Sequence, residues 1–267
     1  MKANGYPYQF DQDGKIVMDK FDNITTQQSR QPPLDPMPSI SVFFPCHNEV
    51  ANIEPLVKKT LHILTGLGPE FEIIIVDDGS GDGTDKVADS LAAQIEALKV
   101  VHHPTNLGYG AALQSGFKAA TKELVFYTDG DGQFDIGEMP ALLPMTRQYD
   151  IVSCYRLNRQ EGLARKFNAW AWTKLVCLVF NMDLRDIDCG FKLFKRRIFD
   201  DITIRSTGAL IDAEILTRAI RKGYTVTQRG VHHYPRKAGT QSGAKLSVIF
   251  RAFKELFKLR KEILSEP

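Results

Sequence analysis

Apolar and polar residues alternate in blocks along the chain from residue 39 onward. Five apolar runs have the length of buried strands. They are ISVFFP, EIIIVDD, LKVVHH, ELVFYTD and DIVSCY. Between them lie segments of helical period, namely Ile53–Leu64, Thr84–Ala97, Gly108–Ala120 and Gly137–Arg147. Continuous apolar strands that alternate with helices predict an α/β fold, with a mostly parallel, Rossmann-like sheet flanked by helices.

After Tyr155 this alternation ends. The pattern then predicts a helix, a loop rich in Asp, Gly and aromatic residues, a second helix, a short strand TVTQRGV and a final helix. The three helices are Leu163–Asn181, Ile211–Lys222 and Leu246–Leu264. The final helix is amphipathic, with basic residues between its apolar positions, which suits a membrane interface, its own core or a partner helix.

The proline-rich QPPLDPMP ends a polar stretch, so residues 1–38 are interpreted as an N-terminal arm or linker. Residues 39–245 then form the main domain, and residues 246–267 form the amphipathic C-terminal helix. The length of 267 residues is ample to bury the core of one large domain.

A net charge of +2 gives no reason to expect nucleic acid as a partner. The four cysteines are scattered, without metal-ligand spacing, which favours a reduced, cytoplasmic setting. The N-terminus lacks the apolar core of a signal peptide. The run Ala169–Phe180 is shorter than the roughly 20 apolar residues that span a bilayer and contains Lys174. Any membrane contact is therefore expected to be peripheral.

Polar residues follow three of the predicted strands, in PCHNE, VDDGSGDGT and TDGDGQ. In an open parallel sheet, ligands bind beyond these carboxyl ends of the strands. Neither GxGxxG after the first strand nor GxxxxGK[ST] is present, which disfavours dinucleotide and P-loop sites. Glu49, Asp77 and Asp78 are instead candidate acceptors for a nucleobase and ribose. A simple strand-to-helix turn would explain the glycines and Thr84, but not two adjacent aspartates.

Asp129 and Asp131 are two residues apart, so in an extended segment they point the same way. Two carboxylates aimed at one place repel unless a cation lies between them. Oxygen ligands without nearby His or Cys favour Mg²⁺ or Mn²⁺, with Gln133 as an additional neutral oxygen. Because Mg²⁺ usually needs only one or two carboxylates plus substrate phosphates, a nucleoside diphosphate is expected. The alternative is a charged surface turn.

An ordered set of motifs extends over most of the chain, from about Ser39 to Leu264: PCHNE, IIIVDDGSGDGT, NLGYGAALQSGF, TDGDGQFD, RDIDCGFKLFKR and GALIDAEIL. This set resembles the family-two glycosyltransferases of GT-A fold. The subgroup it resembles is the polyprenyl-phosphate sugar synthases of the dolichol-phosphate mannose synthase type.

The resemblance implies a role for each matching position. The nucleotide-sugar pocket would be lined by Pro45, His47, Glu49, Asp77, Asp78, Gly108 and Asp129. The metal would be held by Asp129, Asp131 and Gln133. Asp186 matches the family's acidic residue, whereas Asp188 and Cys189 replace the usual Thr-Ser. This departure leaves open whether Asp186 or Asp188 faces the reacting centre.

A phosphate acceptor is largely dianionic at neutral pH, so it needs cations more than it needs a strong base. The second half of the sequence supplies Arg156, Arg159, Arg165, Lys166, Arg236, Lys237 and Lys245. By resemblance, Arg156 and Arg165 are the phosphate-binding arginines, and Arg236 and Lys245 are further candidates. The alternative is that these side chains are solvated at the surface.

Adjacent histidines in a strand point to opposite faces, so His232 and His233 cannot both chelate one metal without a bend. Structural or acceptor-loop roles are favoured for this pair and for His102 and His103.

The sequence therefore predicts an inverting, metal-dependent enzyme with Asp131, Asp186 and Arg156 as catalytic residues. It would transfer a sugar from a nucleotide sugar, of GDP-mannose or UDP-glucose type, to a polyprenyl phosphate. The enzyme would be peripheral on the cytoplasmic face of the membrane. One alternative is a sugar or lipid hydroxyl acceptor, with Asp186, Asp188 or Glu214 as base. Another is a non-catalytic nucleotide-sugar-binding protein. The sugar, the nucleobase and homo-oligomer formation stay open.

Overall fold

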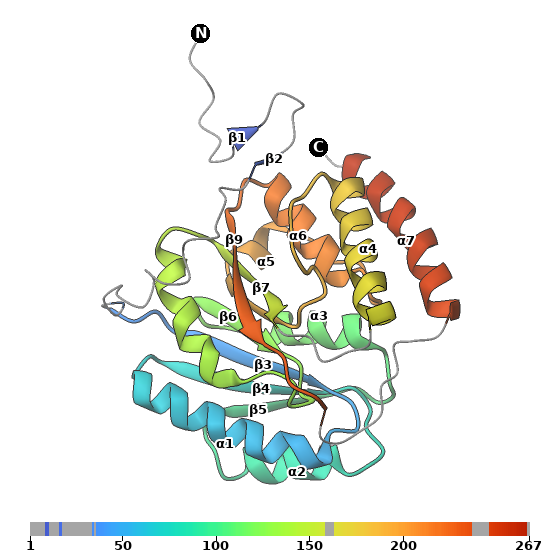
Figure 1. The fold of residues 1–267 in the computed structure, drawn as a ribbon. Helices are drawn as coiled ribbons and strands as arrows, with labels where there is room; N and C mark the ends of the chain where they lie inside the picture. The colour runs from blue at the N-terminus through green and yellow to red at the C-terminus, as the bar shows by residue number, and fades with distance from the viewer. Residues whose placement is uncertain are drawn as a thin grey trace.

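The structure is a computed structural model, and it describes residues 9–10, 16–17, 34, 36–157, 163–236 and 246–265. Its centre is a seven-stranded sheet of order β5-β4-β3-β6-β8-β7-β9, shown in Figure 1. Two short strands, β1 (Gln9–Phe10) and β2 (Ile16–Val17), pair separately from it. The predicted α/β class and the mostly parallel sheet are confirmed.

The first half of the sheet is parallel and contains β3 (Ile40–Cys46), β4 (Phe71–Asp77), β5 (Leu98–His102) and β6 (Leu124–Thr128). The three helices between these strands are α1 (Val50–Leu67), α2 (Thr84–Ala92) and α3 (Tyr109–Ala119). Each predicted strand and helix of this half is present. The second helix ends at Ala92 rather than Ala97, because the chain must turn so that the Ala97 carbonyl can accept from Ile73 N.

The second half of the sheet contains β7 (Ile151–Leu157), β8 (Phe191–Lys195) and β9 (Val226–His232). Its helices are α4 (Leu163–Phe180), α5 (Ile198–Asp201), α6 (Ile211–Arg221) and α7 (Leu246–Ser265). Strand β8 runs antiparallel between β6 and β7. The sequence pattern predicted only a loop there, because Lys192 interrupts the apolar run although it is fully buried.

The segment Ile136–Arg147 is a 3₁₀ helix (η3) rather than the expected α-helix. Pro140 and Pro144 lie inside it. Since proline has no N–H to donate, each removes one hydrogen bond of an α-helix.

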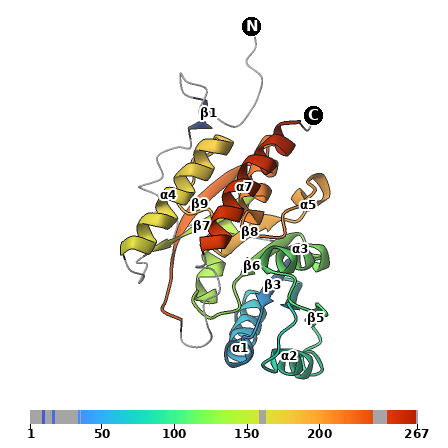
Figure 2. The ribbon, with the colours of Figure 1, turned by 90° about the vertical axis from the view of Figure 1, so that its right-hand side faces the viewer.

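Two apolar clusters cover the two faces of the sheet. Helices α1, α2 and η3 contribute to one cluster, and α3, α4, α6 and α7 contribute to the other. Helices α4 and α7 lie side by side in Figures 1 and 2, and Arg260 Nε donates to the carbonyl of Val179 at 3.1 Å. Among the residues described, no helix combines the length and apolarity that crossing a membrane requires.

Candidate active site

Three strand ends meet at one edge of the sheet, as the sequence predicted. Strand β3 lies between β4 and β6, and Cys46 is in register with Asp77. Asp78 N donates to the carbonyl of Cys46 at 2.8 Å, and Gly130 N donates to the carbonyl of Pro45 at 3.3 Å. The segments that follow β3, β4 and β6 are therefore neighbours in space.

The loops after β3 and β4 are joined by hydrogen bonds. Glu49 N donates to Thr84 Oγ1 at 2.9 Å, and Val50 N donates to Asp82 Oδ2 at 3.1 Å. His47 Nδ1 lies 2.9 Å from the carbonyl oxygen of Asp78. Part of the DGSGDGT sequence is thus used to build the site, because Asp82 binds the first free N–H of α1.

Asp77 and Asp78 are both buried, and their carboxylates have partners within the protein. Asp78 accepts from Leu107 N at 2.8 Å and from Gly108 N at 2.9 Å. Nδ1 of His103 lies 2.7 Å from the Asp78 carboxylate, which confirms a structural place for this histidine. Asp78 therefore supports the turn that carries Gly108, and its role in reading a nucleotide stays a prediction.

Asp77 accepts from Ser80 N at 3.1 Å, and its other oxygen lies 3.1 Å from His102 Nδ1. His102 also lies 3.0 Å from Asp89, on α2. The hydrogen bonds to Asp77 and then to Asp89 raise the pKa of His102. Asp77 thus holds the turn after β4 and the end of β5, and its contact with base or ribose stays a prediction.

The acidic pair Asp129 and Asp131 follows β6, and both side chains are partly buried. Burial, and next the charge of Asp131, raise the pKa of Asp129 to about 7. The Tyr109 hydroxyl donates to Asp129 at 3.0 Å, and Asp131 accepts from Gln133 N at 3.0 Å. A cation between the two carboxylates would offset the effect of Asp131 on Asp129.

Gly190, directly before β8, leaves space for the Asp129 carboxylate. A Cβ atom at Gly190 would lie only 2.3 Å from Asp129 Oδ2. Asp129 N also donates to the carbonyl of Gly190, at 3.3 Å. Any larger residue at position 190 would therefore displace the Asp129 carboxylate.

The two carboxylates fit a divalent ion whose remaining coordination positions are filled by a bound ligand. Within the described ranges, no group of three or more His, Cys, Asp and Glu side chains could hold a metal alone. Two carboxylates fit Mg²⁺ or Mn²⁺ if phosphate oxygens supply further ligands. Gln133 is placed beside the pair, but its Nε2 donates to the carbonyl of Tyr234 at 3.0 Å, so only its oxygen is suited to a metal.

Arg236, just beyond β9, reaches the same acidic group. Its guanidinium pairs with Glu49 and lies 3.8 Å from Asp131 Oδ2. Burial raises the pKa of Glu49, and the neighbouring Asn52 and Arg236 oppose that rise. The structure thus places Arg236 beside the predicted donor residues, whereas the sequence analysis assigned it to the acceptor phosphate.

The structure separates the two candidate acids before β8. Arg156 Nε and Nη2 donate to the two oxygens of Asp186, both at 2.7 Å. Among the described residues, none offers the Asp188 carboxylate a hydrogen bond or an ion pair. Burial, and next the charges of Asp212 and Asp186, raise the pKa of Asp188 to about 7. Asp186 is therefore paired with Arg156, whereas Asp188 is partly exposed and has no such partner among the described residues.

Sequence reasoning missed a buried charge network beneath the site. Lys192 Nζ lies 2.9 Å from Asp212 and donates to the Tyr127 hydroxyl at 3.1 Å and the Cys189 carbonyl at 2.5 Å. Tyr127 in turn donates to Asp212. The signal was the alternation in FKLFK, which points Lys192 to the same face as Phe194.

A further cation was also missed. The guanidinium of Arg185, next to Asp186, lies 4.9 Å from the centroid of the Tyr155 ring and is exposed. Of the other predicted cations, Arg159, Lys237 and Lys245 lie outside the described residues. Arg165 lies in α4, and its side chain is not among those described.

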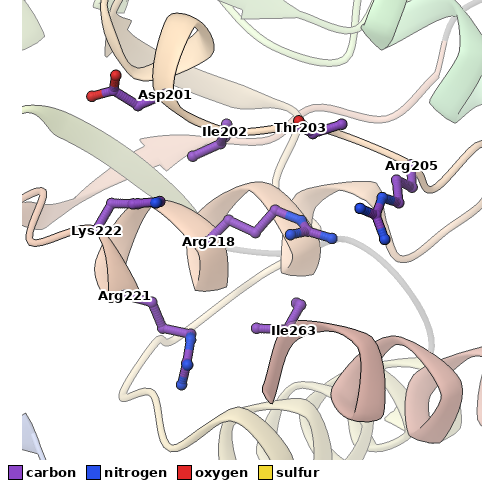
Figure 3. A pocket seen from close by; sticks show the side chains of 8 residues that line it. All are labelled: Asp201, Ile202, Thr203, Arg205, Arg218, Arg221, Lys222 and Ile263. Carbon is purple, nitrogen blue, oxygen red and sulfur yellow. The ribbon is translucent and has the colours of Figure 1, made fainter. Parts of the chain in front are cut away.

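A separate cavity of about 390 Å³ lies between α6, α7 and the segment after α5. In Figure 3 the guanidinium groups of Arg205 and Arg218 point toward one another across it. Arg218 Nε donates to the buried Glu214 at 2.8 Å. This cavity contains none of the predicted catalytic, nucleotide-binding or metal-binding residues, so it is not part of the candidate active site.

The parallel β3–β6 edge with an acidic pair beyond β6 is the arrangement of a GT-A glycosyltransferase. Residues 41–203 match the family described as glycosyl transferase family 2. The chain belongs to this family.

A curated relative is the glycosyltransferase AglD of Haloferax volcanii, 33% identical over 207 residues, which are 74% of this chain and 33% of AglD. The chain therefore spans about a third of the length of that relative. Mannosyl-3-phosphoglycerate synthase from Rubrobacter xylanophilus has a TM-score of 0.69 at 18% identity, covering 89% of this chain and 80% of that chain.

Glucosyl-3-phosphoglycerate synthase from Mycobacterium tuberculosis, in complex with Mn²⁺, uridine diphosphate and phosphoglyceric acid, has a TM-score of 0.61 at 17% identity. That match covers 86% of this chain and 80% of the other. At these identities, the two synthase structures support the fold.

Proposed function

We propose that the protein transfers a sugar from a nucleotide sugar to a polyprenyl phosphate, with inversion at the anomeric carbon and with Mg²⁺ or Mn²⁺. The carrying observation is the acidic pair Asp129 and Asp131, whose mutual repulsion needs a cation. The solved synthase bound to Mn²⁺ and uridine diphosphate supports this reading, as does a second complex with Mg²⁺.

The acidic residues of the site are assigned to the metal and the basic residues to the phosphate groups. Asp129 and Asp131 would hold the metal, which would supply positive charge for the leaving nucleoside diphosphate. Arg236 lies 3.8 Å from Asp131, close enough to bind the same diphosphate. Arg156 is paired with Asp186, and the exposed Arg185 next to Asp186 supplies the positive charge that draws in the acceptor phosphate. The acceptor's own negative oxygen attacks the anomeric carbon, so no strong base is required.

The acceptor's lipid chain needs an apolar surface near the membrane. Helices α4 and α7 expose five large apolar side chains: Phe167, Trp170, Leu178, Phe257 and Leu264. Lys258, Arg260 and Lys261 are exposed on α7 beside them. Apolar residues flanked by cations are typical of a surface that binds an anionic membrane. This surface supports a peripheral place on the cytoplasmic face of the membrane.

A second acceptor class is favoured by one observation, the Asp188 carboxylate without a described partner. Such a carboxylate could deprotonate a hydroxyl acceptor. Transfer of labelled sugar to polyprenyl phosphate, to polyprenol and to phosphoglyceric acid in parallel separates the two classes. Our proposal requires transfer to polyprenyl phosphate alone.

The Asp131→Ala variant tests the metal site. We expect loss of Mn²⁺-dependent transfer, with the circular dichroism spectrum unchanged. Among the described residues, the Asp131 carboxylate accepts a hydrogen bond from Gln133 N and lies 3.8 Å from Arg236, and it makes no other hydrogen bond or ion pair. An excess of chelator should stop the unmodified protein in the same way. Full activity of the variant would contradict the proposal.

A further inference from the structure

Asp188 differs from the other acids near the site in what surrounds it. Asp186 is matched by Arg156, and Asp212 is matched by Lys192. Asp129 accepts from Tyr109. Among the described residues, no such neighbour is found for Asp188, although its side chain is only partly exposed.

Asp188 is also close to the place where a donor sugar would lie. It is two residues before Gly190, where an added Cβ would lie only 2.3 Å from Asp129 Oδ2. In a nucleotide sugar the transferred sugar is bonded directly to the diphosphate that the metal holds. The sugar would therefore lie near Asp129, whose carboxylate is bordered by Gly190 of the loop before β8.

The charges around Asp188 decide which ligand group it can accept. Asp212 and Asp186 act on it as negative neighbours, while Lys192 and Arg156 are already paired with those two acids. A phosphate oxygen would be repelled there. Sugar hydroxyls are uncharged hydrogen-bond donors, and one carboxylate can accept from two of them.

We propose that Asp188 accepts hydrogen bonds from hydroxyl groups of the transferred sugar and thereby determines which hexose the enzyme uses. This inference rests on the proposed function. It assigns no proton transfer to Asp188 and no contact with the acceptor.

The raised pKa of Asp188 agrees with a residue kept for binding rather than for stability. Its charge is disfavoured by burial and by Asp212 and Asp186, so the ligand-free protein is less stable because of it. Functional residues commonly carry such a cost. Removing the charge should leave the melting temperature of the ligand-free protein unchanged or higher.

The test compares nucleoside diphosphates with nucleotide sugars. Calorimetric titrations with Mn²⁺ use GDP, UDP, GDP-mannose and UDP-glucose on the full chain and its Asp188→Ala and Asp188→Asn variants. We expect the diphosphate that binds to keep its affinity within about twofold in both variants. The matching nucleotide sugar should lose at least about tenfold with alanine and less with asparagine, which keeps one acceptor.

Asp183→Ala is the matched control, because Asp183 is an exposed acid five positions earlier in the same loop. It should change none of these affinities. Equal losses for diphosphate and sugar, or no loss for either, would overturn the role of Asp188. Lost turnover with unchanged affinity would also overturn it, since that result indicates a base. If the unmodified protein bound none of the four ligands, the proposed function would fail as well.

Discussion

Lys192 is fully buried in β8, and its ammonium group has oxygen partners on three different segments. Asp212 belongs to α6, Tyr127 to β6, and Cys189 to the loop before β8. A buried ammonium group is tolerated only where such partners replace water. The network therefore holds β6, α6 and the loop before β8 together beneath the site.

Replacing Lys192 by methionine should leave the buried Asp212 carboxylate without its counter-charge. We expect a loss of about 3–5 kcal/mol in the free energy of unfolding. Urea denaturation measures this loss. The double variant Lys192→Met, Asp212→Leu should recover most of it, because both charges are then absent. A double variant as unstable as the single one would show that the ion pair is not the cause.

Gly190→Ala should impair the metal site without unfolding the protein. The added Cβ would meet Asp129 Oδ2 at 2.3 Å, so the carboxylate must move. We expect at least tenfold weaker binding of Mn²⁺ in the presence of nucleotide, measured by calorimetry. Gly66→Ala is the control, because nothing lies within 4 Å of a Cβ there. It should leave binding unchanged and slightly stabilise α1.

At the scale of elements, the loop after β4 supplies a carboxylate that accepts a hydrogen bond from the first N–H of α1. Asp82 accepts from Val50 N at 3.1 Å and from Thr84 N at 3.0 Å. Partial burial acts to raise the pKa of Asp82, but hydrogen bonds from Thr84 and Val50 outweigh it and lower the pKa. Two helices that are separate in sequence therefore share one capping carboxylate.

Asp82→Ala should destabilise the protein by about 1 kcal/mol, the usual value of a side-chain hydrogen bond to the first N–H groups of a helix. Because the pKa of Asp82 is lower in the folded protein, its contribution is present at neutral pH and is lost as the pH falls through that value. The difference from the unmodified protein should therefore shrink toward pH 3. Denaturation at pH 7 and pH 3 measures this, and an equal difference at both would refute it.

The sequence predicted the helices and strands in which the pattern of apolar positions is uninterrupted. The strands β3 to β7 were found because their apolar runs are continuous, and α1 to α3 because their apolar positions repeat regularly. Strand β8 was missed because the burial of Lys192 depends on Asp212 and Tyr127, which are distant in sequence. The 3₁₀ helix η3 could have been inferred from Pro140 and Pro144, which act locally.

The sequence predicted which acidic residues lie at the candidate site, but not which of them form ion pairs with arginine or lysine. Strand ends placed Glu49, Asp129 and Asp131 together, since neighbouring parallel strands end at one edge. The bidentate contact of Arg156 with Asp186 joins residues 30 positions apart and has no sequence signal. Which acid is free for a ligand therefore became visible only in the structure.

For the whole molecule, the exposed apolar face of α4 and α7 yields a prediction about membranes. The Phe167→Ser, Trp170→Ser double variant should bind vesicles containing anionic phospholipid at least tenfold more weakly than the unmodified protein. Sedimentation with vesicles measures this binding. Val50→Ser, on α1 at the other face of the sheet, is the matched control. Unchanged binding of the double variant would argue against this surface.

The segment beyond β9 is attached to the segment beyond β6. Tyr234 N donates to the carbonyl of Gln133 at 2.8 Å, and the Gln133 side chain donates back to the carbonyl of Tyr234. A displacement of the backbone at Gln133 should therefore also displace the backbone at Tyr234. A fluorophore attached near Tyr234, which is 45% exposed, would therefore report the arrival of a nucleotide at Asp131 as a change of emission, without touching the pocket itself.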